Sequence, residues 1–103
     1  PMICCGEEME ELVPNTSEGA AEKHLPVVKQ EGSSITVSVG SASHPMQEDH
    51  HIAWIYLQTE DGGHRRSIPF GKEPSICFAL TKDEIPVAVF AYCNLHGLWK
   101  TPL

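Results

Sequence analysis

The order of apolar and polar residues in this 103-residue chain predicts short β-strands. Ser34–Val39 alternates apolar and polar side chains, as a half-buried strand does. Asp61-Gly62-Gly63 predicts a tight turn between two neighbouring runs. The runs of strand length are Ser34–Val39, His51–Leu57, Arg65–Phe70, Ser75–Leu80 and Val87–Tyr92.

Prolines separate these runs and exclude long helices, because proline removes a backbone donor and clashes with the preceding helical turn. The prolines concerned are Pro26, Pro45, Pro69, Pro74 and Pro86. Several short strands at this spacing predict an all-β fold, an antiparallel β-sandwich.

The net charge and the length of the apolar runs argue against two classes of partner. Seven Lys and Arg against fourteen Asp and Glu give a net charge of −7, whereas a nucleic-acid-binding protein normally presents a basic face. The longest apolar runs are far shorter than a membrane span, and no apolar segment typical of a signal peptide opens the sequence. We therefore expect neither a nucleic acid nor a membrane as partner.

Cysteine usage indicates a reducing compartment. Cys4, Cys5, Cys77 and Cys93 do not have the spacing of a disulfide framework, since one pair is adjacent and the others lie far downstream. In the cytoplasm, which we take as the expected location, thiols more often serve metals or catalysis.

Side chains of metal-ligand type lie at the edges of the predicted strands. Cys93 and His96 have a spacing that lets a thiolate and an imidazole reach one metal from a single turn, which Gly97 helps to close. Loops gathered at one end of a sandwich bring distant segments together. The candidate ligands are His24, His44, His50, Cys93 and His96.

Three other residues of ligand type are expected to have no such role. His51 begins a strand next to His50, so its side chain should point away from that of its neighbour. His64 follows two glycines and precedes two arginines, and we expect it to be solvated. Cys77 lies between Ile76 and Phe78, and we expect a small, buried apolar residue.

The ligand types discriminate between metals. Zinc prefers four tetrahedral ligands, often with more cysteines. Four imidazoles and one thiolate suit a five-coordinate iron with one open position, at which a small ligand can bind and react. A blue-copper site is the alternative, but it uses two histidines, one cysteine and usually an axial methionine downstream, whereas the last methionine here is Met46.

The residues alone leave three functions open. The first is an enzyme with one catalytic iron. The second is an electron-transfer module that never binds oxygen species. The third is an immunoglobulin-like binding domain in which the histidines are incidental.

Four motifs closely resemble the superoxide reductase family, which comprises desulfoferrodoxins and neelaredoxins. The resemblance covers about residues 10–103, and the motifs occur in the family's order. They are Glu22-Lys23-His24-Leu25-Pro26, His44-Pro45-Met46 with His50, Ile52-Ala53-Trp54-Ile55, and Cys93-Asn94-Leu95-His96-Gly97-Leu98-Trp99-Lys100.

The resemblance implies a fold and a metal site. The fold would be an immunoglobulin-like antiparallel β-sandwich of about seven strands. One mononuclear non-haem iron (Fe2+/Fe3+) would have one axial thiolate and four equatorial imidazoles. By motif, the thiolate is that of Cys93, and the imidazoles are those of His24, His44, His50 and His96.

The resemblance also implies a reaction, the one-electron reduction of superoxide to hydrogen peroxide in antioxidant defence. The electron would come from a small redox protein such as rubredoxin, and the chain would form a homodimer or homotetramer. Glu22 resembles the carboxylate that can take the sixth position in the oxidised state, and Lys23 resembles the cation near the open face. A local cation is needed because superoxide is an anion and the net charge of −7 repels it.

The N-terminal segment departs from the two-iron members of the family. Residues 1–15 resemble the tail of a desulforedoxin-like domain followed by a linker, and by the same resemblance residues 16–103 would form the iron-binding domain. Cys4 and Cys5 match the second cysteine pair of that domain, but the first pair is absent, so one chain is not expected to build a four-cysteine iron site. Cys4 and Cys5 are then relics of a shortened member, ligands shared between two chains, or what remains after loss of the preceding segment.

Overall fold

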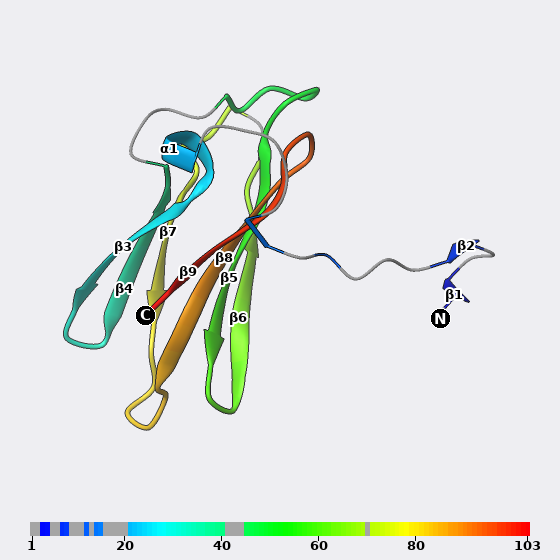
Figure 1. Cartoon of the computed structure of the whole chain (residues 1–103). Helices are drawn as coiled ribbons and strands as arrows, with labels where there is room; N and C mark the ends of the chain where they lie inside the picture. Colours follow the sequence, from blue (N-terminus) through cyan, green and yellow to red (C-terminus); the bar gives the residue numbers. More distant parts are fainter. Residues whose placement is uncertain are drawn as a thin grey trace.

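The computed structural model describes residues 3–4, 7–8, 12, 14–15, 21–40, 45–69 and 71–103. Two sheets and one four-residue helix account for its secondary structure, apart from a pair of two-residue strands (Figure 1). The elements are β1 (Ile3–Cys4), β2 (Glu7–Glu8), α1 (Ala21–His24), β3 (Pro26–Glu31), β4 (Ser34–Val39), β5 (Ile52–Thr59), β6 (Gly62–Ser67), β7 (Ser75–Ala79), β8 (Pro86–Cys93) and β9 (Gly97–Pro102).

The two sheets are antiparallel throughout, with strand orders β3-β4-β7 and β6-β5-β8-β9. Lettered A to G in chain order, these seven strands form sheets ABE and DCFG. An immunoglobulin constant domain has ABED and CFG, so here the fourth strand, β6, pairs with β5 instead of β7. The predicted antiparallel sandwich of about seven strands is confirmed, with this difference in pairing.

The core lies between the two sheets because their strands alternate in burial. In β4, the side chains of Ile35 and Val37 are fully buried, while Thr36 between them is exposed. The other sheet contributes its inward residues from β5 and β8 in the same way. The buried core cluster contains Ile35, Val37, Val39, Ile52, Ile55, Leu57, Ile68, Phe78, Val89, Ala91 and Cys93.

Two edge strands, β3 and β9, were not predicted from the sequence. Each is bounded by a proline, since Pro26 begins β3 and Pro102 lies at the end of β9. Proline is tolerated at such positions because an edge strand can lack a ladder donor. The predicted strands matching β4 and β8 agree with the structure to within one residue at each end.

The hairpin of β5 and β6 differs in register from the prediction. Thr59 pairs with Gly62, so the turn consists of Glu60 and Asp61, and both glycines belong to β6. The Tyr56 side chain lies over Gly63, where a Cβ would overlap the tyrosine ring and the Leu57 carbonyl oxygen. Gly63 therefore provides room for the aromatic side chain of the neighbouring strand. The strand β6 ends at Ser67, whereas the sequence predicted a strand that extends to residue 70.

One prediction about a side chain is wrong, and another holds only in part. Cys77 is exposed, because strand alternation directs Ile76 and Phe78 inward and the residue between them outward. His64 is not simply solvated, because its Nε2 lies 2.7 Å from Oε2 of Glu84 and its side chain is 36% exposed.

The Glu84 carboxylate is held by two groups. The backbone N–H of Thr81 donates to its Oε1 at 2.8 Å, and His64 contacts its other oxygen. The Thr81 hydrogen bond first, and the His64 hydrogen bond second, lower the pKa of Glu84 below its ordinary value. This cluster links β6 to the 81–85 loop, which connects the two sheets.

Within the described part of the chain, no helix has the length and apolar character needed to cross a membrane.

Candidate metal centre

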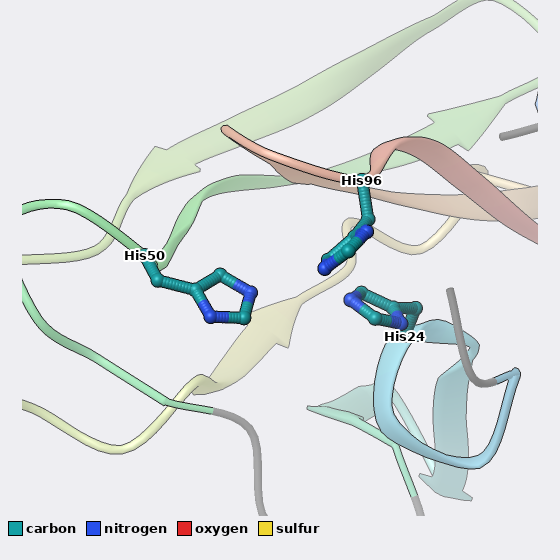
Figure 2. A group of neighbouring side chains, drawn as sticks. All are labelled: His24, His50 and His96. Atoms are coloured by element: carbon teal, nitrogen blue, oxygen red, sulfur yellow. The ribbon is translucent and has the colours of Figure 1, made fainter. Parts of the chain in front are cut away.

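Three histidines from distant parts of the chain converge at one end of the sandwich. His24 is the last residue of α1, His50 precedes β5, and His96 lies in the turn between β8 and β9. One ring nitrogen from each lies within 4.8 Å of the others. Figure 2 shows the three rings pointing toward a common space. The structure therefore brings together three of the five candidate ligands.

The imidazole rings contact one another edge to face. The ring centroid of His96 lies 4.8 Å from that of His24 and 5.1 Å from that of His50, at interplanar angles of 67° and 66°. His24 is only 2% exposed, and the Nε2 atoms of His24 and His50 are shielded from solvent. The cluster is thus shielded on one side and accessible around His50 and His96, which are partly exposed.

Local sequence explains two of the three positions. The residue before a proline disfavours helical geometry, so α1 ends directly before Leu25 and Pro26, leaving His24 at its terminus. Gly97 has φ of 79°, a conformation that favours glycine, and it pairs with Cys93 to close the turn that carries His96.

Trp99 supports two of the histidines, a role that was not predicted from the sequence. Its ring stacks on that of His24, with centroids 5.0 Å apart and an interplanar angle of 18°. Its indole Nε1–H donates a hydrogen bond of 3.0 Å to the backbone oxygen of His96. Trp99 is 4% exposed. This one buried side chain therefore restrains both α1 and the turn after β8.

Cys93 lies between the segments that carry two of the histidines. As the fully buried last residue of β8, it pairs with Ile52 on one side and with Gly97 on the other. His50 lies two residues before Ile52, and His96 lies directly before Gly97. The register of β5 and β8 shifts between Ile52 and Trp54, next to this site. Among the described residues, the group within 4.8 Å contains the three histidines and does not include Cys93.

The other candidates are placed only in part. Lys23 is exposed in α1, directly before His24. Glu22 belongs to α1 by its backbone, while its side chain and all of His44 lie outside the described residues. His51 lies outside the histidine group, and its Nδ1 lies 3.0 Å from the backbone oxygen of Gln47.

The donors present fit a transition-metal ion. Imidazole is a common ligand of zinc, copper, iron and nickel, and three converging ring nitrogens provide half of an octahedral shell. A thiolate on a neighbouring strand end adds a softer donor. The arrangement can therefore bind one metal ion and leave further coordination positions for other residues or a small ligand.

Comparison with known proteins gives a consistent set of relatives. The family model described as Desulfoferrodoxin matches residues 16–102. A desulfoferrodoxin homologue from Archaeoglobus fulgidus is 40% identical over 100 residues, covering 97% of this chain and 78% of the relative. A superoxide reductase from Pyrococcus abyssi is 34% identical over 96 residues, covering 77% and 84%.

A solved structure shows the same fold. The crystal structure of the superoxide reductase from Treponema pallidum aligns with a TM-score of 0.89 at 39% identity, covering 96% of this chain and 83% of that one.

Proposed function

The chain belongs to the desulfoferrodoxin family, and on that premise we propose that it is a superoxide reductase. In the proposed reaction, one superoxide anion takes up one electron and two protons to give one hydrogen peroxide. The observation that carries the proposal is the convergence of His24, His50 and His96 in a chain whose relatives include proteins named superoxide reductases.

The proposed cofactor is one iron ion per chain. Its ligands would be His24, His50 and His96 together with His44 and the thiolate of Cys93. Iron bound there supplies a one-electron redox couple and an open position for a small anion. The burial of Cys93, in register with segments of two histidines, supports its assignment as the thiolate ligand. A thiolate raises electron density on iron, which favours electron donation to an oxygen species.

Lys23 is proposed to attract the substrate. The net charge of −7 disfavours approach of an anion, and an exposed ammonium beside His24 makes the local potential more positive. Glu22, one residue earlier on α1, is kept as the candidate carboxylate for the sixth position in the oxidised state.

The remaining assignments complete the proposal. A rubredoxin-like protein would supply the electron, the chain would form a homodimer or homotetramer, and the enzyme would act in antioxidant defence in the cytoplasm. The proposed domain spans residues 16–103, which agrees with the family match beginning at residue 16. Cys4 lies in β1 and Cys5 outside the described residues, so the alternatives for this pair stay predictions.

The stoichiometry of products tests the proposed function. The iron-loaded, reduced protein is mixed with superoxide, and peroxide and dioxygen are both measured. Reduction yields one peroxide per superoxide and no dioxygen, whereas dismutation yields one peroxide and one dioxygen for every two superoxide anions. We expect the first result, with no such reaction in metal-free protein. Release of dioxygen with half the peroxide, or no acceleration by the loaded protein, would contradict the proposal.

A further inference from the structure

Asn94 connects the turn after β8 to the segment that carries His50. Its side-chain Oδ1 accepts a hydrogen bond from the backbone N–H of His51 at 2.9 Å, and its Nδ2 donates to the backbone oxygen of Asp49 at 3.0 Å. Its own backbone N–H donates to the backbone oxygen of His51 at 3.2 Å. One residue therefore bonds to the chain on both sides of His50.

The segment bound by Asn94 also forms a turn with its own backbone hydrogen bonds, between Gln47 and His50. The N–H of Gln47 donates to the oxygen of His50 at 2.9 Å, and the N–H of His50 donates back to the oxygen of Gln47 at 3.1 Å. These two bonds shape the 47–50 turn without connecting it to the rest of the site. Asn94, which lies between Cys93 and His96, adds hydrogen bonds from this segment to the turn that carries His96, beside the pairing of Ile52 with Cys93.

We propose that Asn94 is a positioning residue of the metal centre, which holds the His50 backbone at a set distance from the turn of Cys93 and His96. This inference rests on the proposed metal site. A side-chain amide suits this role because its oxygen accepts from the His51 N–H while its nitrogen donates to the Asp49 carbonyl oxygen. A carboxylate keeps the acceptor but loses the donor, and an alkyl side chain loses both.

The expected effect is on metal affinity more than on folding. Asn94 is exposed, and an ordinary hydrogen bond makes only a small net contribution to stability. Residues that orient metal ligands have a larger effect on binding, and their replacement typically costs about 10- to 100-fold in metal affinity. The two effects can therefore be separated.

Asn15 provides a matched control. Its Oδ1 accepts from the N–H of Lys100 at 2.8 Å, and its Nδ2 donates to the oxygen of Lys100 at 3.2 Å. This is the same two-bond use of an exposed amide, but it connects to the edge strand β9 and not to the His50 segment. The variants are Asn94→Ala, Asn94→Asp and Asn15→Ala.

The first test measures ferrous iron affinity by anaerobic competition with a chelator, alongside the melting temperature of each metal-free protein. We expect Asn94→Ala to bind iron about 10-fold or more weakly, Asn94→Asp to be intermediate, and Asn15→Ala to match the wild type. Similar melting temperatures should accompany these differences. Equal affinities for Asn94→Ala and wild type, or an equal loss in Asn15→Ala, would overturn the proposal.

The second test needs no metal and separates this inference from the proposed function. Hydrogen exchange of the His51 backbone amide reports its bond to Asn94 directly in the metal-free chain. We expect slow exchange in the wild type and in Asn15→Ala, and faster exchange in Asn94→Ala. Unchanged exchange in Asn94→Ala would overturn the positioning role, whereas failure of wild-type protein to bind iron would overturn the proposed function.

Discussion

The two ends of the sandwich use histidine in different ways. At one end, His24, His50 and His96 face one another, with ring centroids about 5 Å apart. At the other end, His64 faces a carboxylate, with 2.7 Å between its Nε2 and Oε2 of Glu84 (Figure 1 shows the elements at both ends). The first set comes from three distant segments, whereas the second joins β6 to one loop.

This difference shows that the neighbours of a histidine decide its role. An imidazole beside a carboxylate forms a local pair that needs no cofactor and links two elements of the fold. Imidazoles that face one another offer converging lone pairs, which suit one shared metal ion. His24, His50 and His96 lie outside the strands, whereas His64 lies within β6.

Replacing one histidine at each end of the sandwich by alanine should give the largest difference in iron affinity. We expect His96→Ala to reduce iron affinity by more than about 100-fold, beyond the cost of losing a residue that only orients a ligand, because it removes a proposed ligand. His64→Ala should leave affinity unchanged and lower the melting temperature, because it removes the partner of Glu84. Calorimetric titration and thermal melts measure both. A loss of iron affinity in His64→Ala would contradict the assignment of different roles to the histidines at the two ends.

The two tryptophans offer a second contrast. Trp99 stacks on His24 and donates to His96, whereas Trp54 stacks on Tyr92 at 5.5 Å on the outer face of the larger sheet. Trp99→Phe keeps an aromatic surface but loses the N–H, and we expect about a 10-fold loss in iron affinity. Trp54→Phe should bind iron like the wild type. Equal iron affinities in the two variants would show that the Trp99 N–H does not support the site.

Lysines at the two ends test substrate attraction. Lys23 lies on α1 beside His24, and Lys82 lies on the loop at the Glu84 end. We expect Lys23→Ala to slow the reaction with superoxide about fivefold at low ionic strength, a part of the 10- to 1,000-fold that charge steering can supply. The salt dependence of the rate should weaken too. The same slowing in Lys82→Ala would show that only net charge matters.

The smallest expected effect concerns pH at the Glu84 end. The pKa of Glu84 is lowered below 4.5 in the folded protein, chiefly by the Thr81 N–H and then by His64. Its ionised form therefore stabilises the fold above the unfolded pKa, and this contribution is lost as pH falls through the folded pKa. Thermal melts of wild type and Glu84→Gln should differ at neutral pH and converge in acid. A difference that persists or grows in acid would contradict this.

Much of the fold could be predicted from the sequence because alternation is a local signal. Alternation placed β4 at its observed bounds, and runs of apolar, β-branched or aromatic residues identified β5, β7 and β8. The edge strands β3 and β9 lack that signal, because the last three residues of β3 are all exposed and β9 has a single buried residue, Trp99. Cys77 was wrongly expected to be buried because an apolar run was favoured over the period of two that its neighbours obey.

The site could be predicted only as a set of ligand types. His24, His50 and His96 were identified because they lie at strand ends, and the structure brings them together. The supporting roles of Asn94 and Trp99 depend on which distant backbone atoms they meet, and this follows from tertiary register rather than from local pattern. Both lie within the quoted Cys93–Lys100 motif, which was the one available signal.

Iron content and the visible spectrum of the oxidised protein test the metal centre most directly. The measurement compares wild type with Cys93→Ala and with the exposed-cysteine control Cys77→Ala. We predict about one iron per wild-type chain and a thiolate-to-ferric absorption band that Cys77→Ala keeps and Cys93→Ala loses. A chain that takes up no iron, or a band that survives in Cys93→Ala, would contradict the account.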